Sequence, residues 1–300
     1  MALNNFPVSP NEVKRYTGEL DKIVSQKAVT GFLADNVFRA KFVGAKTVII
    51  PDVVFVGLSD YDRDKGFARG ATTISQTSFT LTKDRGRQLQ IDREDLDETG
   101  VANLAGQVLG EFARTKVVPE VDAYVLSKLA GVAKTQSNST TESGTGKYFA
   151  DFIEQINAIR AEIGHDEELV AFVDNSFHTG LITSDEFGKT IDVGSFKKGE
   201  VDTQVTRVNG VPIIPVADSR MKTSYTFGDN GFAPAEDAKD IRLIVMPKKA
   251  ASLVKKTETM RIFTPDQNKD ADAYVFNYRL YYDVFVKKSN LNFIRAVISA

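Results

Sequence analysis

Residues that could carry out chemistry are few in this chain, and they lack the neighbours that such chemistry needs. Cysteine is absent and the only histidines are His165 and His178. Thiolate zinc sites, cysteine nucleophiles and disulfides are therefore excluded, and histidine-based chemistry has little to draw on. Ser176 lies two residues before His178, but no nucleophile elbow surrounds the pair. A hydrolase is one hypothesis, and it requires this pair to converge with a carboxylate in a pocket.

Two further motifs resemble ligand-binding loops without completing them. Residues 144–147 (GTGK) suggest a phosphate loop, but the pattern requires glycine where Thr141 stands. Residues 60–64 (DYDRD) begin like a calcium-binding loop, but Lys65 replaces the required glycine. The other carboxylates are scattered, so no glycosidase-type pair can be nominated. The sequence predicts no catalytic residue, no cofactor and no metal ion.

The composition is that of a soluble protein with a sizeable core. The 300 residues, 42% of them hydrophobic and 26% charged, suffice for one large domain or two ordinary ones. The net charge of -2 argues against a general affinity for nucleic acid or anionic membranes. The first ten residues do not resemble a signal peptide, and no apolar run approaches the roughly 20 residues that span a bilayer. We expect a cytoplasmic protein, or one that assembles there.

An amphipathic helix is predicted near the N-terminus. Ser9, Pro10 and Glu12 form a capping box, and Gly31 is the expected stop. The apolar residues that follow the box at helical spacing are Val13, Tyr16, Leu20, Ile23 and Val24. Such a face needs a partner, either the core of the same chain or a neighbouring subunit.

A long β-hairpin is predicted in the first third of the chain. Residues 46–58 are rich in apolar β-branched side chains and residues 72–82 alternate between polar and apolar ones. The charged, glycine-bearing residues 59–71 form the tip between them. Pro51 argues for an edge strand or a bulge. Because one face of the hairpin is too polar for burial, we expect the hairpin to project from the body.

Charges are unevenly distributed around this hairpin. Residues 83–86 (KDRG) are predicted to turn into a further short strand at 88–91. Six bases and four acids give residues 60–87 a net charge of +2, whereas residues 92–98 carry a net charge of -4. The acidic run either complements the dipole of the helix predicted after it or docks the basic hairpin of another copy. The residues of this inter-subunit hypothesis are Asp60, Asp62, Arg63, Asp64, Lys65, Arg69, Arg85, Arg87, Asp92, Glu94, Asp95, Asp97 and Glu98.

A long helix and a broken α/β section follow. Helical spacing over residues 101–132 is interrupted by Pro119, which predicts a kink or two helices meeting near Val118. After a polar loop, the pattern predicts a helix over residues 148–163 and a buried strand over residues 169–173. Short strands among long loops are expected from there to residue 246.

The clearest strand pattern lies near the C-terminus. From Tyr274 to Val286 every second residue is aromatic or aliphatic, a strict period of two. A Lys-Lys-Ser-Asn turn then leads to residues 291–299. We therefore predict a long hairpin that closes the chain.

This order of elements resembles the major capsid (coat) proteins of tailed bacteriophages, which share the Hong Kong 97 fold. Residues 117–124 (VVPEVDAY) resemble the family's spine helix, and residues 209–216 (NGVPIIPV) its glycine-containing strand in the axial domain. Residues 241–263 with residues 273–286 resemble the return into the peripheral domain. The resemblance implies an α+β fold with an N-terminal arm, an extended β-hairpin loop, a peripheral domain with a long spine helix, and an axial domain.

The resemblance also implies an organisation and a role. The implied segments are an arm (1–44), an extended loop (45–92), a peripheral domain with the spine helix (93–140), an axial domain (141–254) and the peripheral return strands (255–300). The implied role is structural rather than enzymatic. Many copies, as hexamers and pentamers, would build an icosahedral head shell in the cytoplasm of a host bacterium and become part of the virion.

Several partners follow from the same resemblance. A separate scaffolding protein, a portal and a decoration protein are implied. Double-stranded DNA would be enclosed without sequence-specific binding, and no membrane contact is expected. The alternative within the same fold is the shell of an encapsulin-like nanocompartment, which would bind a cargo enzyme on its inner wall.

Overall fold

The structure is a computed structural model of the whole chain. It describes residues 28–34, 41–43, 46–54, 56–61, 63–64, 66–67, 70, 73–94, 104–142, 144, 147–184, 191–198 and 201–300. The amphipathic helix predicted over residues 9–24 lies outside this part of the chain. Gly31, its expected stop, is the first residue of a short 3-10 helix, η1 (Gly31–Ala34).

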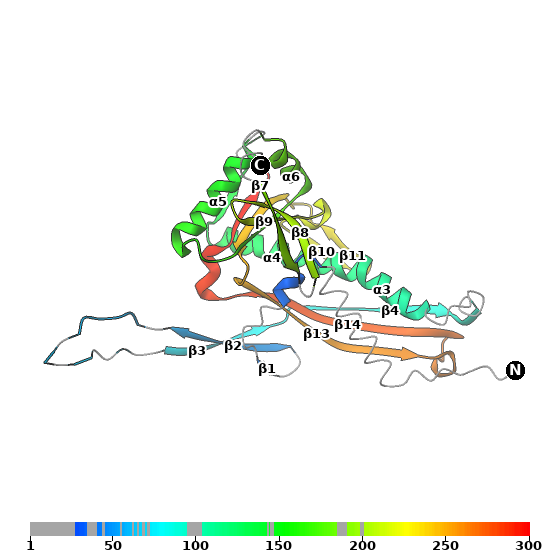
Figure 1. Cartoon of the computed structure of the whole chain (residues 1–300). Coiled ribbons are helices and arrows are strands. Elements are labelled where there is room, and N and C mark those ends of the chain that lie inside the picture. Colours follow the sequence, from blue (N-terminus) through cyan, green and yellow to red (C-terminus); the bar gives the residue numbers. More distant parts are fainter. Residues whose placement is uncertain are drawn as a thin grey trace.

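The described elements form a layered body from which one hairpin projects (Figure 1). A three-stranded sheet, called here the body sheet, lies along one side in the order β13 (Ala251–Phe263), β14 (Ala273–Val286), β4 (Lys83–Asp92). The long helix α4 (Val118–Thr135) packs on it. A seven-stranded sheet covers the other side of α4, and two helices cover the far face of that sheet.

The seven-stranded sheet gathers strands from residue 139 to near the C-terminus. Its order is β5 (Ser139–Thr141), β15 (Arg295–Ile298), β12 (Ile241–Pro247), β6 (Leu169–Val173), β9 (Val211–Pro215), β8 (Val201–Val208) and β7 (Ile191–Lys198). Helices α5 (Tyr148–Ile163) and α6 (Asn175–Ile182) pack on the face away from α4. The predicted helix over residues 148–163 and strand over residues 169–173 are therefore confirmed.

A proline near the start of α4 explains how the long helix is built. Helix α3 (Leu104–Phe112) continues through one π-helical turn, η2 (Ala113–Val117), into α4, where Pro119 stands in the first turn. Proline has no N–H to donate, and single π turns, although rare, occur inside α-helices where the regular hydrogen-bond ladder is interrupted. Two helices do meet at Val118, as predicted, but the helical backbone continues through the junction.

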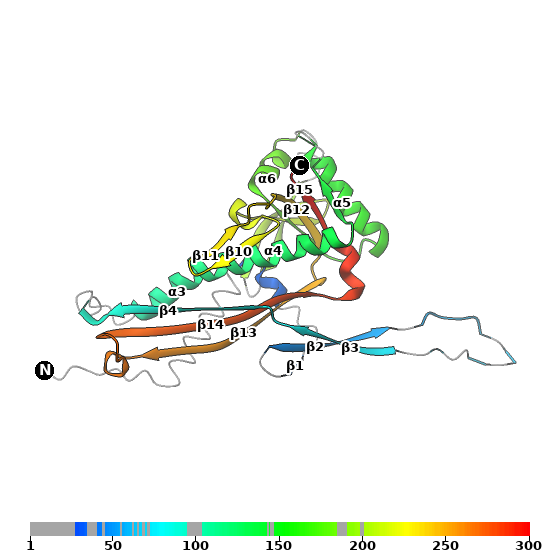
Figure 2. The same cartoon turned by 180° about the vertical axis from the view of Figure 1, so that it is seen from behind.

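Strand β14 is the centre of the body sheet (Figure 2). It pairs antiparallel with β13 over nearly its whole length and with β4 from Ala273 to Tyr282. The even-numbered side chains that the period of two singled out join the core under α4. The odd-numbered Tyr281 and Phe285 are buried on the opposite face, so β14 is covered on both sides over this part.

Two predictions in this region are wrong. The chain does not end in a hairpin, because a 3-10 helix, η6 (Lys288–Phe293), carries it from β14 to β15 in the other sheet. Residues 83–86 do not form a turn, because they belong to β4 and pair with Arg279 to Tyr282 of β14. Charged side chains are tolerated there since Asp84 and Arg279 form a cross-strand ion pair with an Nη2–Oδ2 distance of 2.8 Å.

A buried carboxylate ties the chain before the hairpin to the body. Asp122 of α4 is fully buried and accepts hydrogen bonds from the backbone N–H groups of Val29 and Thr30, each at 3.0 Å. Arg220, from the 3-10 helix η4 (Asp218–Arg220), binds the same carboxylate at 3.1 Å. Asp122 therefore joins the segment 28–34, the long helix and the linker near the seven-stranded sheet.

Candidate assembly interface

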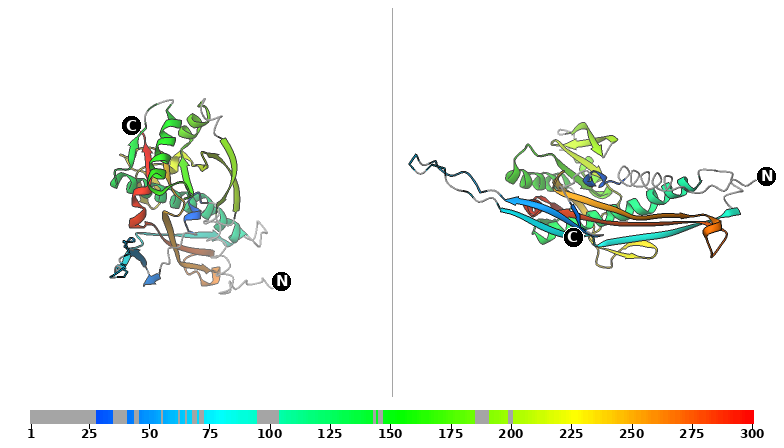
Figure 3. Two further views of the ribbon diagram at one scale, coloured as in Figure 1. Left: turned by 60° about the vertical axis from the view of Figure 1, so that its left-hand side comes forward. Right: turned by 90° about the horizontal axis from the view of Figure 1, so that it is seen from below.

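The predicted hairpin exists and projects from the body (Figure 3). Strand β2 (Thr47–Val54) pairs antiparallel with β3 (Thr73–Thr80), and β1 (Lys41–Val43) adds to β2 over Thr47 to Ile49. Pro51 lies beyond the reach of β1. The missing N–H of the proline therefore costs no ladder bond on that side, which agrees with the edge position predicted for it.

An apolar cluster anchors the root of the hairpin. Val48, Ile50 and Leu81 are buried against Tyr281 and Phe285 on the odd-numbered face of β14. Burying side chains of this kind stabilises by about 1.5–3 kcal/mol each. The root thus behaves as part of the core, although the rest of the hairpin extends beyond the body.

A buried carboxylate adds polar contacts at the same root. Asp283 of β14 is fully buried and accepts hydrogen bonds from the backbone N–H and the hydroxyl of Thr82, at 3.1 and 2.9 Å. From α4, the Tyr124 hydroxyl donates to it at 2.9 Å, and Lys128 forms an ion pair with it. Burial raises the pKa of Tyr124, so its hydroxyl stays protonated and able to donate. The direction in which the hairpin leaves the body is fixed by these contacts.

The tip of the hairpin differs in character from its root. Leu58 is fully exposed, and Phe67 is 87% and Tyr61 59% exposed. The two aromatic rings contact each other edge to face, with 5.0 Å between their centroids. Val56 and Ile74 expose their side chains on the same projection. Large apolar side chains gathered on an extension of this kind mark an interaction surface.

The predicted contact residues are spread over two places. Asp60, Arg63 and Asp64 are exposed at the tip, whereas Arg85 and Arg87 lie on β4 in the body. Asp62, Lys65, Arg69, Asp95, Asp97 and Glu98 lie outside the described residues. Since three of the six bases counted for the hairpin, Lys83 with the two arginines, belong to β4, the tip itself is not basic: residues 60–70 carry three acids and three bases.

The bases on β4 hold a small β-hairpin that reaches down from the upper part of the molecule. This hairpin consists of β10 (Tyr225–Gly228) and β11 (Gly231–Pro234). Arg85 donates to the carbonyl of Gly228 at 2.9 Å, and Arg87 donates to that of Asp229 at 2.9 Å. The Lys83 ammonium lies 3.6 Å from the centroid of the Phe227 ring. Side chains of one edge strand therefore fix the β10–β11 turn against the body.

The ion pair behind this contact is partly buried. The Arg85 guanidinium binds both carboxylate oxygens of Glu120 on α4, at 2.7 and 3.3 Å, and the Tyr282 hydroxyl donates to the same carboxylate. The hydrogen bond to Glu120 raises the pKa of Arg85. Burial lowers the pKa of the neighbouring Lys83, with the Arg85 charge as the second cause. Bidentate arginine–carboxylate pairs of this geometry fix orientation as well as adding stability.

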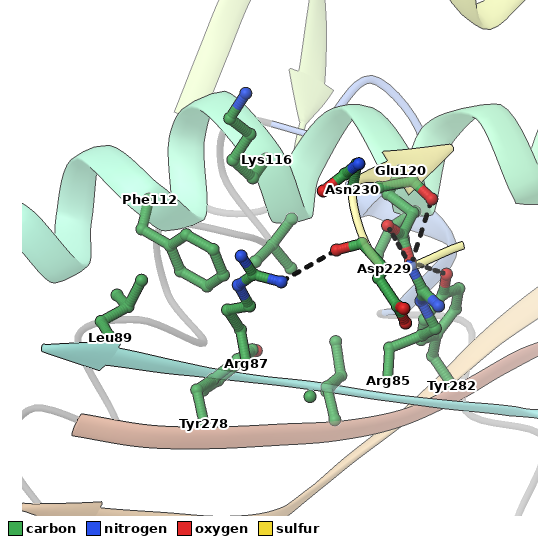
Figure 4. A pocket seen from close by; sticks show the side chains of 15 residues that line it. Arg85, Arg87, Leu89, Phe112, Lys116, Glu120, Asp229, Asn230, Tyr278 and Tyr282 are labelled. Carbon is green, nitrogen blue, oxygen red and sulfur yellow. Dashed lines mark hydrogen bonds and ion pairs between the residues drawn. The ribbon is translucent and has the colours of Figure 1, made fainter. Parts of the chain in front are cut away.

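A cavity of about 350 Å³ lies beside this contact, between the long helix and the body sheet (Figure 4). The apolar part of its wall comes from Leu89, Phe112, Val117, Tyr278 and Leu280. Its charged lining residues are Arg85, Arg87, Lys116, Glu120 and Asp229. The cavity therefore combines an apolar interior with charges, and those of Arg85 and Glu120 are paired with each other.

The acidic run is described only at its start. Asp92 accepts a hydrogen bond from the backbone N–H of Glu94 at 2.9 Å, and Arg93 forms an exposed ion pair with Asp272 at 3.7 Å. Helix α3 is described from Leu104 onward. The choice between a helix-dipole role and a docking role for the run stays open.

The geometry does not support the hydrolase hypothesis. Ser176 and His178 lie two positions apart on α6, and side chains with this spacing on a helix do not face each other. The nearby carboxylate of Asp174 caps α6 by accepting from the Phe177 N–H at 2.7 Å, and it also pairs with Arg242. Among the described residues, no group of three or more metal-binding side chains gathers, and no helix has the length and apolarity to cross a bilayer.

Sequence reasoning missed the apolar residues of the tip and the cavity. The tip was interpreted as a charged loop because its acids and bases dominate the composition. A signal was present, since Tyr61 and Phe67 are large aromatic residues in the predicted tip, a segment with no strand or helix period, and Leu58 directly precedes it. The cavity could not have been found, because its lining comes from β4, the long helix, the β10–β11 turn and β14.

The comparisons with known proteins bear on the fold. No protein-family model matches the sequence, and a search of curated proteins gives no significant match. Among solved structures, the capsid of the cyanophage P-SCSP1u is similar with a TM-score of 0.56 at 16% identity, over 87% of this chain and 85% of that one. A protein of Mycobacterium phage Ogopogo is similar with a TM-score of 0.54 at 10% identity, over 89% and 91%.

Other matches agree with these two. The mature capsid of bacteriophage PhiM1 matches with a TM-score of 0.50 at 14% identity, over 85% of this chain and 82% of that one. A virus-like particle from Pyrococcus furiosus gives 0.49, too low to argue for the nanocompartment alternative. The chain has the α+β fold of phage capsid structures, as the resemblance in its sequence implied.

Proposed function

We propose that this chain, folded like phage capsid subunits, is the major capsid protein of a tailed bacteriophage. Many copies, as hexamers and pentamers, build the icosahedral head shell that encloses the genome. The observation that carries this proposal is the projecting hairpin. Its root is fixed to the body by Asp283 and an apolar cluster, while its tip exposes large apolar side chains beyond the body.

A contact between copies explains why the hairpin exposes large apolar side chains, which are unfavourable in a solitary protein. Exposed aromatic and aliphatic side chains on a long extension are an aggregation liability unless another molecule covers them. In a closed symmetric assembly, the same extension meets the same neighbouring surface in every copy. The thirteen charged residues named for the inter-subunit hypothesis remain the proposed contacts, and their charges set register and partner choice more than strength.

The five sequence segments fit this role as proposed structural units. The arm (1–44) and the extended loop (45–92) would reach neighbours. The peripheral segments (93–140 and 255–300) carry the long helix and most of β13 and β14, while β4, the third strand of the body sheet, comes from the extended-loop segment. The axial segment (141–254) contributes most of the seven-stranded sheet. On this proposal the axial segments surround the centre of each capsomer.

Further partners belong to the same proposal. The shell assembles in the cytoplasm of the host bacterium with a separate scaffolding protein, a portal and a decoration protein, and then forms part of the virion. The near-neutral chain, with a net charge of -2, encloses double-stranded DNA without gripping it by sequence. No enzymatic step is assigned to it.

The test is whether the chain forms shells. The chain is expressed alone and together with the genes that flank its own, and the products are examined by electron microscopy and by light scattering over a range of concentrations. Closed particles of uniform size are expected in at least one arm. Monomers in both arms at every concentration would reject the proposal, and a co-purifying cargo enzyme would favour the nanocompartment instead.

A further inference from the structure

The exposed aromatic pair at the hairpin tip and the cavity under the long helix are complementary in chemistry. Phe67 and Tyr61 expose most of their surface while their rings contact each other. The cavity offers about 350 Å³ with an apolar wall that includes Leu89, Phe112 and Leu280. Pockets of roughly 300–1,000 Å³ with mostly apolar linings are typical sites for a compact apolar group.

The two features cannot meet within one molecule. The tip lies at the far end of the projecting hairpin, whereas the cavity lies beside α3 and β4, toward the opposite end of the body (Figures 1 and 2). The root is held by Asp283 and the apolar cluster, so the hairpin cannot fold back to reach it. Any tip that enters this cavity must come from a second copy.

Charge favours the same pairing. Three cations (Arg85, Arg87, Lys116) and two carboxylates (Glu120, Asp229) line the cavity, giving a net charge of +1. Residues 60–70 at the tip are neutral overall, with three acids and three bases, but Asp60 directly precedes Tyr61. Since Arg85 is neutralised by Glu120, Lys116 and Arg87 are the lining cations that would attract Asp60 when Tyr61 enters.

A second apolar groove gives a less complementary site. It has about 260 Å³ at the root of the hairpin, lined by Phe79, Leu129, Leu291 and neighbouring residues. Its cation, Lys128, is already paired with the buried Asp283. This groove therefore offers apolar contact without a cation for the acids of the tip.

We propose that Phe67, with Tyr61 beside it, inserts into the cavity under the long helix of a second copy, where Lys116 of that copy faces Asp60. The inference rests on the proposed shell function and specifies its contact: the hairpin is held mainly by apolar insertion, and the charges fix its register. The tip of one copy and the cavity of the next form a heterologous contact, which closes into rings when the rotation between copies allows.

Cross-linking tests the contact directly, because the chain has no cysteine of its own. Asp60→Cys and Lys116→Cys, which face each other on this proposal and leave Phe67 in place, are made in separate chains and co-assembled under the conditions in which the wild-type chain forms particles. A disulfide-linked dimer is expected on a non-reducing gel after mild oxidation, since only thiols whose Cα atoms approach within about 7 Å can be bridged. The matched control pairs Asp60→Cys with Leu291→Cys in the root groove and should give no dimer.

Charge reversal provides a second measurement that does not depend on thiols. Asp60→Lys and Lys116→Glu, each alone, are expected to lower particle yield about tenfold, because like charges would meet at the contact. The two changes together are expected to restore most of the yield.

The outcomes separate this inference from the proposed function. If the wild-type chain forms particles, three results would each overturn the insertion and leave the shell proposal standing. They are a dimer through Leu291→Cys, no dimer from either cysteine pair, and no rescue of particle yield in the double charge-reversal variant. Absence of wild-type particles under every condition would instead reject the shell proposal itself.

Discussion

The body of the molecule and its projecting hairpin differ in whether their side chains find partners within the same chain. In the body, even buried charges have partners within the chain: Asp122 has Arg220 and two backbone N–H groups, and Asp283 has Lys128 and Thr82. On the hairpin, Leu58 and Phe67 expose apolar surface that water must cover. The two buried carboxylates of the body are thus satisfied within one chain, whereas the exposed apolar side chains of the hairpin would be covered only by another molecule, as the proposed building block requires.

Because of this difference, substitutions in the body and in the hairpin should affect different properties, namely subunit stability and particle assembly. Substitutions in the body should change the free energy of unfolding of a single subunit. Equivalent substitutions beyond the root of the hairpin should leave that free energy almost unchanged and act only on particle formation.

The largest effect on stability is expected from Asp283→Ala. The change leaves the Thr82 N–H and the Lys128 ammonium without their buried acceptor, and breaking a buried ion pair from one side costs about 3–5 kcal/mol. Because Lys128 is partly exposed, we expect a loss near the lower end, measured by urea unfolding of the dissociated subunit. Glu111→Ala, which removes only an exposed pair with Arg114, should change stability by less than about 0.5 kcal/mol. Equal losses in both variants would contradict the role of Asp283.

Two glycines, one in the body and one in the hairpin, allow the two regions to be compared through a stability change of intermediate size. A Cβ at Gly86 of β4 would lie 2.9 Å from the carbonyl oxygen of Tyr278, whereas a Cβ at Gly57 of the hairpin would meet nothing within 4 Å. Gly86→Ala should therefore destabilise the subunit by about 1–3 kcal/mol through overpacking, and Gly57→Ala by less than about 0.5 kcal/mol. Thermal and urea unfolding of the two variants gives the comparison. A costlier Gly57 variant would mean that the hairpin is part of the folded core.

The smallest expected effect is on the pH dependence of the subunit's stability. Hydrogen bonds from Arg279, and then from Lys46, hold the pKa of Asp84 well below its ordinary value of 3.8. A carboxyl whose folded-state pKa is lowered contributes stability above its ordinary pKa and loses it as the pH falls toward the folded value. Exposed pairs contribute only about 0–1 kcal/mol, so Asp84→Asn should flatten the acid limb of the stability curve slightly. The urea midpoint, followed from neutral pH to below 3.8, measures this. An identical acid limb in both proteins would show that the Asp84 pairs contribute nothing.

Sequence patterns predicted the parts whose signal is local. The period of two in β14, the proline in the long helix, the β-branched composition of β2 and the alternation of β3 each reflect a residue's immediate surroundings. The errors concerned pairing between distant segments. Residues 83–86 are charged and look like a turn, and only β14, nearly 200 residues later, makes them a strand.

Prediction of the candidate interface from the sequence was limited in the same way. The sequence indicated that the hairpin projects, and it gave the charges around it. It did not indicate which charges stay with the body, because the assignment of Arg85 and Arg87 depends on the β10–β11 turn some 140 residues away. Strand β13 was also not predicted as one continuous strand, because its lysines and threonines give no apolar alternation. Only its pairing with β14 identifies it as a strand.

The π-helical turn before Pro119 makes chain length a variable of its own. Each residue advances an α-helix by about 100°, but a single π turn takes up one extra residue locally, here within Ala113–Val117. Leu109 of α3 and Val121 of α4 therefore reach the same core in spite of the extra residue. Deleting one residue there should close the turn to an ordinary α-helix with both faces still on the sheet, whereas inserting one outside it would rotate α3 by about 100° and turn Leu109 and Phe112 away from that core.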